Sequence, residues 1–167
     1  MNCTEGRQRM GATTHERQTT IVTPQDATNF TAFGSPVTIT LRSENTAGQY
    51  AMLEFRLAPS PYGPAPHSHT TFDELYQVLD GEISALVNGT QQRVTAGSSI
   101  FVPRGTVHTL SNPYDTPARF LYLVSPAGFE RYFEDFAAAA TVAGGPVPPD
   151  VAAAITSRYD VVPASSE

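Results

Sequence analysis

The 167-residue sequence has one cysteine and no long hydrophobic run. Cys3 has no second cysteine to pair with, which excludes an internal disulfide and gives no reason to expect an oxidising compartment. No stretch reaches the roughly 20 apolar residues that a membrane-spanning helix needs. Residues 1–20 also lack the apolar centre of a secretory signal peptide. We therefore expect a cytoplasmic protein with no membrane partner.

Positive charge is scarce as well. The chain has 10 lysine and arginine residues against 16 aspartate and glutamate residues, a formal net charge of −6. Nucleic acids and anionic membranes bind basic surfaces, so we expect neither as a partner. Apolar residues make up 40% of the chain and charged residues only 16%. This composition favours one compact, β-rich domain over a helical or disordered chain.

Short alternating segments, separated by turn residues, occupy the middle of the chain. Asp80-Gly81 and Asn88-Gly89 are both typical two-residue hairpin turns. No strand–helix–strand alternation is present, which disfavours a parallel α/β sheet. The pattern therefore predicts an all-β protein, a sandwich or a jelly-roll barrel over residues 19–126. Its period of two predicts strands near 37–41, 50–57, 74–78, 82–87, 91–94, 98–102, 107–111 and 118–124.

Helical spacing replaces this alternation after the last predicted strand. Ser125-Pro126 is typical of a helix start, and Gly144-Gly145 would end that helix. A second short helix is expected from about Pro149 to about Arg158. An aromatic stripe on the first helix is expected to pack on the outer face of the barrel or in a dimer contact. It consists of Phe129, Tyr132, Phe133 and Phe136.

The chain therefore divides into three predicted parts. Residues 1–18 are polar and without periodicity, and we expect a flexible N-terminal arm. Residues 19–126 form the barrel, and residues 127–167 form a C-terminal helical tail packed on it.

Three histidines and one glutamate form a candidate metal site. His67 and His69 are two residues apart, so both imidazoles leave the same face of an extended strand. Glu74 begins the next predicted strand, and His108 follows a Pro-x-Gly turn on another. Imidazole nitrogens and one carboxylate suit one divalent transition metal (Fe, Mn, Ni, Co, Cu or Zn) better than Ca or Mg. Four protein ligands would leave a position open for water or substrate, as in catalytic metal sites.

The two segments that carry these residues resemble the two motifs of the cupin family. Fifteen residues, 82–96, separate them. The resemblance implies a double-stranded β-helix barrel in which the three histidines and Glu74 bind one metal ion. The motifs read His67-x-His69-x4-Glu74-x6-Gly81 and Gly97-x5-Pro103-x-Gly105-x2-His108-x3-Asn112.

Two further stretches, 126–133 and 45–50, look like those of bacterial quercetinase-like cupins with a single domain. That resemblance implies a dioxygenase acting with O2 on an enolisable, flavonol- or polyketide-like small molecule. Glu74 would then be both a metal ligand and the catalytic base. Two alternatives stay open, because the same barrel hosts different chemistries. One is a non-redox cyclase or isomerase with a Lewis-acid metal, and the other is a ligand-binding protein without turnover.

Strand parity with the metal ligands predicts an apolar substrate pocket. A slip of one residue at a bulge would move any of these side chains to the opposite face. No basic residue lies close to the ligands in sequence, which disfavours a strongly anionic substrate. Cupins with one domain often pair through sheet edges, so the resemblance also implies a homodimer. The candidate pocket residues are Leu53, Phe55, Tyr76, Phe101, Leu110 and Tyr122.

Overall fold

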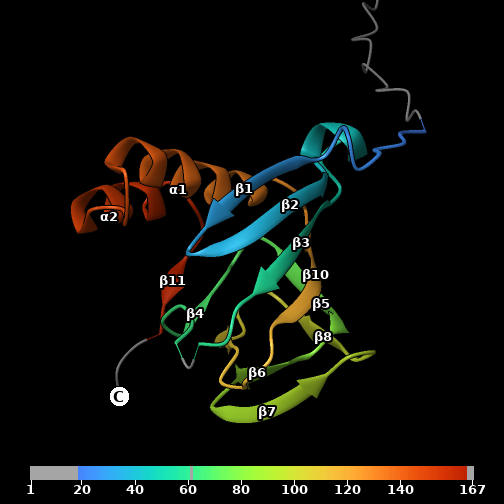
Figure 1. Cartoon of the computed structure of the whole chain (residues 1–167), viewed down its shortest axis with the longest axis vertical. Helices are drawn as coiled ribbons and strands as arrows, with labels where there is room; N and C mark the ends of the chain where they lie inside the picture. The colour runs from blue at the N-terminus through green and yellow to red at the C-terminus, as the bar shows by residue number, and fades with distance from the viewer. Residues whose placement is uncertain (1–18, 61, 165–167) are drawn as a thin grey trace, which may run out of the picture.

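A computed structural model describes residues 19–60 and 62–164. The predicted N-terminal arm, residues 1–18, lies outside this range. The described chain is mostly β, with two short α-helices after the strands (Figure 1). The strands are β1 Thr28–Ala32, β2 Ser35–Leu41, β3 Ala51–Leu57, β4 His67–Ser68, β5 Asp73–Asp80, β6 Glu82–Val87, β7 Thr90–Thr95, β8 Ser99–Val102, β9 His108–Ser111, β10 Ala118–Ser125 and β11 Val162–Pro163. The helices are the 3-10 turn η1 Ser43–Thr46 and the α-helices α1 Glu130–Ala143 and α2 Pro149–Thr156.

The strands form two antiparallel sheets. One has the order β1-β2-β3-β10-β5-β8 and the other β11-β4-β9-β6-β7. Their apolar faces form one core, because side chains alternate between the two faces of each strand. This arrangement is the predicted all-β jelly-roll barrel with a helical tail.

Strand β10 shows how the sequence sets the inner face. Its residues alternate between buried and half-buried along the whole strand. Phe120 lies between Phe55 on β3 and Val78 on β5. Tyr122 lies two residues further along β10, on the same face as Phe120 and opposite Tyr76 on β5. Directly opposed residues share a face, so the aromatic residues of three strands meet inside the barrel.

All eight predicted strands are present, and three short ones lie outside that set. The extended segment expected to carry both His67 and His69 is a strand only at His67–Ser68. β1 is largely polar, and β4 and β11 have two residues each, too few to show a period of two. Their pairing partners define them, since β4 joins β9 on one side and β11 on the other. Such strands depend on contacts between distant segments and not on a local pattern.

The first helix begins later than predicted. Ser125 is the last residue of β10 and pairs with Asp73, so it is not a helix cap. α1 begins at Glu130, whose buried carboxylate accepts hydrogen bonds from the backbone amides of Gly128 at 2.6 Å and Ser43 at 3.0 Å. Gly144 ends α1 in the left-handed conformation (φ 65°), as predicted. Within the described ranges, neither α-helix is long and apolar enough to span a membrane.

The aromatic stripe of α1 faces a different neighbour from the predicted one. The ring of Phe133 lies 5.1 Å from that of Phe55, which points into the barrel. The ring of Phe129 lies 4.9 Å from that of His69. The expectation that these residues cover the outer face is therefore wrong for Phe129 and Phe133, whose rings contact side chains inside the barrel.

Candidate metal centre and aromatic cavity

The three predicted histidines meet inside the barrel. β4 places His67 directly opposite His108 on β9. His69 follows β4, and its carbonyl accepts a hydrogen bond of 2.6 Å from the amide of Gly105 in the turn before β9. One nitrogen of each imidazole lies within 4.8 Å of the others, and these three residues form a possible metal-binding group. The two sequence motifs thus converge at one point.

Backbone carbonyls orient all three rings. Nδ1 of His67 lies 2.8 Å from the carbonyl oxygen of Ala65, and Nδ1 of His108 lies 3.0 Å from that of Thr106. Nδ1 of His69 faces the carbonyl oxygen of Asp160. A carbonyl only accepts hydrogen bonds, so each Nδ1 carries a proton, and each ring in its neutral form presents the lone pair of Nε2 to the centre.

Glu74 adds a carboxylate to this group. Its Oε2 lies 2.7 Å from Nε2 of His108, and its Oε1 lies 3.4 Å from Nε2 of His69. The hydroxyl of Tyr122 donates to Oε1 at 2.6 Å. Only 2% of His69, 2% of His108 and 3% of Glu74 is exposed, so bulk water has little access to these side chains. The fourth predicted ligand therefore lies against two of the histidines.

The atoms that converge here fit a cation. Nε2 of His69, Nε2 of His108 and Oε2 of Glu74 are buried without a hydrogen-bond partner. Such atoms are costly to bury unless something satisfies them, and an acceptor cannot satisfy an acceptor. Imidazole nitrogens with outward-facing Nδ1–H bonds to carbonyls are the usual arrangement of metal-ligating histidines. The residues thus suit a divalent transition metal, although its binding and identity stay predictions.

Charge is distributed to suit such an ion. Burial lowers the pKa of His67, which keeps that ring neutral. Burial alone would raise the pKa of the Glu74 carboxyl, but when His108 and His69 are protonated, their hydrogen bonds and charges outweigh burial and hold this pKa well below its usual range. Burial, followed by the nearby charge of Glu74, raises the pKa of Tyr122. Glu74 is therefore an anion, and Tyr122 stays a protonated donor to it.

A cavity of about 530 Å³ opens beside this centre. Its volume lies within the usual range for small-molecule pockets, about 300–1,000 Å³. His67, Glu74 and His108 form part of its wall. Four of the six predicted pocket residues also line it, namely Phe55, Tyr76, Leu110 and Tyr122.

The middle of the chain matches a known protein family. Residues 53–124 match the family described as "Cupin domain". This segment is similar to a cupin domain. The tetracenomycin polyketide synthase protein TcmJ of Streptomyces glaucescens is 32% identical over 60 residues, which are 36% of this chain and 40% of that protein. The matched segment thus spans less than half the length of that relative.

Solved structures share this fold. KdgF from Halomonas sp. is similar with a TM-score of 0.58 and 15% identity, covering 67% of this chain and 97% of that chain. The polyketide cyclase RemF from Streptomyces resistomycificus is similar with a TM-score of 0.55 and 22% identity, covering 65% of this chain and 80% of that chain. At these identities the likeness shows the fold alone.

Two predicted pocket residues do not line the cavity of this barrel. Phe101 is 62% exposed and pairs with Leu75 on the outer face of the sheet. Its neighbour Val102 pairs with Glu74, so the assignment of Phe101 was wrong by one residue. Leu53 is on the correct face but has no exposed surface, because it is packed in the core behind the cavity wall.

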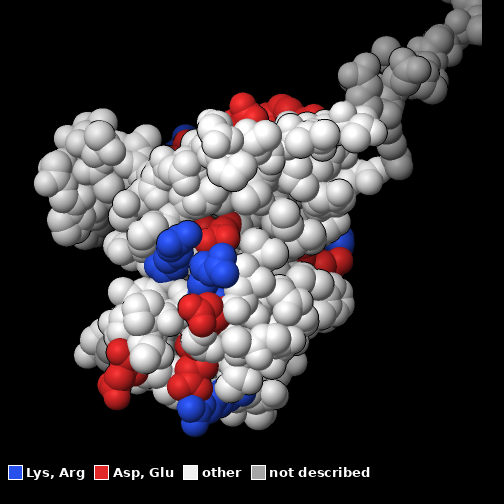
Figure 2. All heavy atoms as spheres, turned by 45° about the vertical axis from the view of Figure 1, so that its right-hand side comes forward, with Lys and Arg blue, Asp and Glu red and all other residues white. Residues whose placement is uncertain are grey.

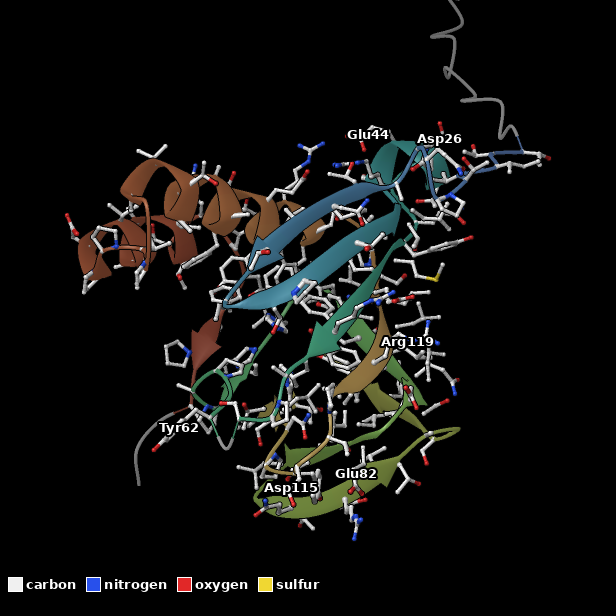
Figure 3. The ribbon with its side chains drawn as sticks, viewed as in Figure 1. Asp26, Glu44, Tyr62, Glu82, Asp115 and Arg119 are labelled. Atoms are coloured by element: carbon white, nitrogen blue, oxygen red, sulfur yellow. The ribbon has the colours of Figure 1, made fainter. Side chains whose placement is uncertain are left out.

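The tail supplies cavity residues that strand parity could not identify. Phe129, Tyr132 and Phe133 form one wall, next to Val161 and Pro163. The helical aromatic stripe was visible in the sequence, but its orientation was not. From other segments, Phe33 of the β1–β2 turn and the exposed Tyr62, labelled in Figure 3, also line the cavity.

Among the described residues, no arginine lines this cavity. Each described arginine instead lies in an ion pair, and Figure 2 shows basic side chains lying beside acidic ones on one face. The cavity wall thus offers aromatic surface, two imidazoles and one carboxylate, which agrees with the expectation of a substrate without strong negative charge. The pairs are Arg42–Glu134, Arg56–Glu54, Arg93–Glu82, Arg104–Asp73, Arg119–Glu54, Arg131–Glu44 and Arg158–Asp135.

A second hollow, of about 1190 Å³, lies between the β1–β2 hairpin and the two α-helices. It is lined mainly by alanine, glycine and phenylalanine residues, and its only carboxylate, on Glu134, is paired with Arg42. It offers no group for catalysis, so we place the functional site at the cavity beside the histidines.

Proposed function

We propose that this cupin domain is a metal-dependent enzyme that cyclises or isomerises a neutral, enolisable, polyketide-like aromatic molecule. The observation that carries the proposal is the placement of His67, Glu74 and His108 in the wall of a cavity otherwise built from aromatic and aliphatic side chains. Aromatic walls bind flat ring systems through stacking and edge contacts. The names of TcmJ and RemF add support for a polyketide-like substrate.

The residues that would hold the metal are His67, His69, His108 and Glu74. A divalent ion there would supply Lewis-acid polarisation of a substrate carbonyl. The ion would also satisfy the three buried acceptor atoms that lack a partner.

Glu74 is the candidate base. Tyr122 donates to its Oε1, whereas its Oε2 has no hydrogen-bond donor and is available to accept a proton. A carboxylate whose pKa is lowered is a weak base, so it can only deprotonate an acidic group, such as a carbon between two carbonyls. The resulting enolate carbon would form a bond to a second carbonyl carbon of the same molecule. The proton would then return from Glu74 to the new alkoxide oxygen.

The predicted quercetinase-like dioxygenase is the second candidate. It uses the same ligands and the same base, and the segment 126–133 of the tail favours it by resemblance. In that case O2 would be consumed and both oxygen atoms would appear in the products. A protein that binds aromatic molecules without turnover is the third alternative.

One experiment separates these functions. Freshly purified protein is analysed for metal content and then incubated with polyketide-like 1,3-diketones and flavonols in an oxygen-electrode cell, with products identified by mass. We expect bound transition metal, no oxygen uptake, and a product of unchanged mass or one that has lost water. Oxygen uptake, with both oxygen atoms recovered in the products taken together, would support the dioxygenase instead. Binding without any product would refute both enzymes.

A further inference from the structure

The segment that follows α2 lies against the metal-ligand strand. We call residues 159–164 the C-terminal strap. Its strand β11 pairs with β4, which places Pro163 opposite His67 (Figure 1). The amide of Ala164 also donates to the carbonyl of Pro66 at 2.9 Å. The strap is therefore joined to the backbone that carries the first histidine of the centre.

Asp160 fixes the strap to the loop after His69. Its carboxylate accepts hydrogen bonds from the backbone amides of Thr70 and Thr71, both at 2.6 Å. It also accepts the hydroxyls of Thr70 at 3.0 Å and Thr71 at 2.7 Å. Hydrogen bonds to a charged acceptor are stronger than neutral ones. Four of them hold one side chain to two consecutive residues of the ligand loop.

The backbone of the same residue touches a metal-ligand candidate directly. The carbonyl oxygen of Asp160 faces Nδ1 of His69, ninety-one residues away in sequence. This contact keeps the proton on Nδ1 and directs Nε2 toward Glu74, 3.4 Å from its Oε1. Ring stacking against Phe72, at 4.3 Å between centroids, restrains the plane of the imidazole but does not select its tautomer.

We propose that Asp160 is a positioning residue for the metal centre. Its carboxylate clamps the strap onto Thr70 and Thr71, so that its carbonyl holds His69 in the tautomer and orientation that a metal needs. The proposal rests on the metal centre of the proposed function, but it does not depend on the reaction. It also assigns the strap to the site itself, because residues outside the barrel complete the surroundings of a ligand.

The test compares Asp160→Ala and Asp160→Asn with the unchanged protein. Affinity for Co²⁺ and Zn²⁺ is measured by competition with a chelator, and the visible spectrum of the Co²⁺ form reports ligand geometry. Nitrogen NMR of the metal-free protein reports the tautomer of His69. The matched control is Asp115→Asn, because Asp115 is an exposed acid with no hydrogen bond or ion pair among the described residues.

We expect Asp160→Ala to weaken metal affinity about 10- to 100-fold, the usual effect of removing support from a ligating histidine. It should also alter the Co²⁺ spectrum and let His69 populate both tautomers. Asp160→Asn should be affected less, since an amide oxygen can still accept from the two backbone amides. The Asp115 variant should match the unchanged protein.

Wild-type affinity, spectrum and tautomer in Asp160→Ala would overturn the proposal while leaving the proposed function intact. If the unchanged protein binds neither metal, the metal centre fails, and the NMR arm alone still tests the positioning of His69. If Asp160→Ala does not fold, Thr71→Val replaces it, since this change removes only the 2.7 Å hydroxyl bond. A smaller loss of affinity is then expected, and unchanged affinity in both Thr71→Val and Asp160→Asn would overturn the proposal.

Discussion

Replacing Glu74 by glutamine should stabilise the metal-free protein at alkaline pH while it weakens metal binding. When the imidazole of His108 is neutral, its Nε2 and Oε2 of Glu74 are two acceptors 2.7 Å apart. A glutamine amide in that place can donate to His108, and its carbonyl can still accept from Tyr122. Each buried, unsatisfied polar atom costs about 1–3 kcal/mol. We therefore expect the free energy of unfolding to rise by about 1–3 kcal/mol, the cost of one such atom.

The sign of this effect should depend on pH. Burial alone would lower the pKa of His108, but the hydrogen bond and charge of Glu74 raise it above the usual 6.5. A raised pKa means that the ion pair stabilises the fold fully below pH 6.5 and that this stabilisation is lost as the pH rises through the folded-state value. In acid, Glu74→Gln removes an existing ion pair and should destabilise the protein.

The effect is measured by urea unfolding with a chelator present, at one pH below and one pH above the folded-state pKa of His108. Glu44→Gln is the matched control, because Glu44 forms an exposed pair with Arg131 and such pairs contribute little, about 0–1 kcal/mol. Destabilisation by Glu74→Gln at both pH values would refute the reasoning, since it would mean that the carboxylate has a proton donor at every pH. Unchanged metal affinity would remove Glu74 from the ligand set.

Four other changes test separate parts of the site. Tyr122→Phe removes the donor to Oε1 of Glu74 and should lower the free energy of unfolding of the chelated protein by about 1.5–3 kcal/mol in urea; no change would mean that this bond is not formed. Adding Zn²⁺ at 100 times its Kd should stabilise the unchanged protein by about 2.7 kcal/mol in thermal unfolding, and a Tm insensitive to metal and chelator would contradict the metal centre. Phe133→Ala should weaken binding of a flat aromatic ligand about tenfold in calorimetry, through lost ring contacts, but leave metal affinity unchanged. Equal losses of ligand affinity and metal affinity would argue against a place for Phe133 in the cavity wall. Arg104 lowers the pKa of Asp73 to about 2. The stabilising effect of this pair is therefore present above pH 3.8 and lost as the pH falls through about 2. Arg104→Gln should return the pKa of this carboxyl, followed by NMR, toward 3.8, and an unchanged pKa would show that the pair is not formed in solution.

The sequence predicted the barrel because its strands alternate with period two and end in turn residues. It also predicted the convergence of His67, His69 and His108, since two motifs fixed their spacing. The alternation of strand residues assigned Phe101 to the wrong face of the sheet, because the register between β5 and β8 decides which face it occupies. Register is a contact between distant segments, and a single strand does not reveal it.

The residues that surround the candidate metal ligands were harder to predict from the sequence than the ligands themselves. Asp160 acts on His69 through a backbone carbonyl, and any residue type has one, so no residue pattern marks this contact. The orientation of the aromatic stripe depends on Glu130, whose carboxylate binds the amide of Ser43 on a distant turn. Local helical spacing identifies such a stripe, but only tertiary contacts decide what it faces.

The proline of β11 limits how copies of this protein could associate. The amide of Ala164 points to β4, so the nitrogen of Pro163, one residue earlier, faces away from the sheet. β11 is the last strand of its sheet, and at this position its outer border has no N–H to offer an incoming strand. Edge prolines hinder strand addition in this way. A homodimer built by joining sheets, as the family resemblance implies, would therefore be expected to use β7, β8 or β1.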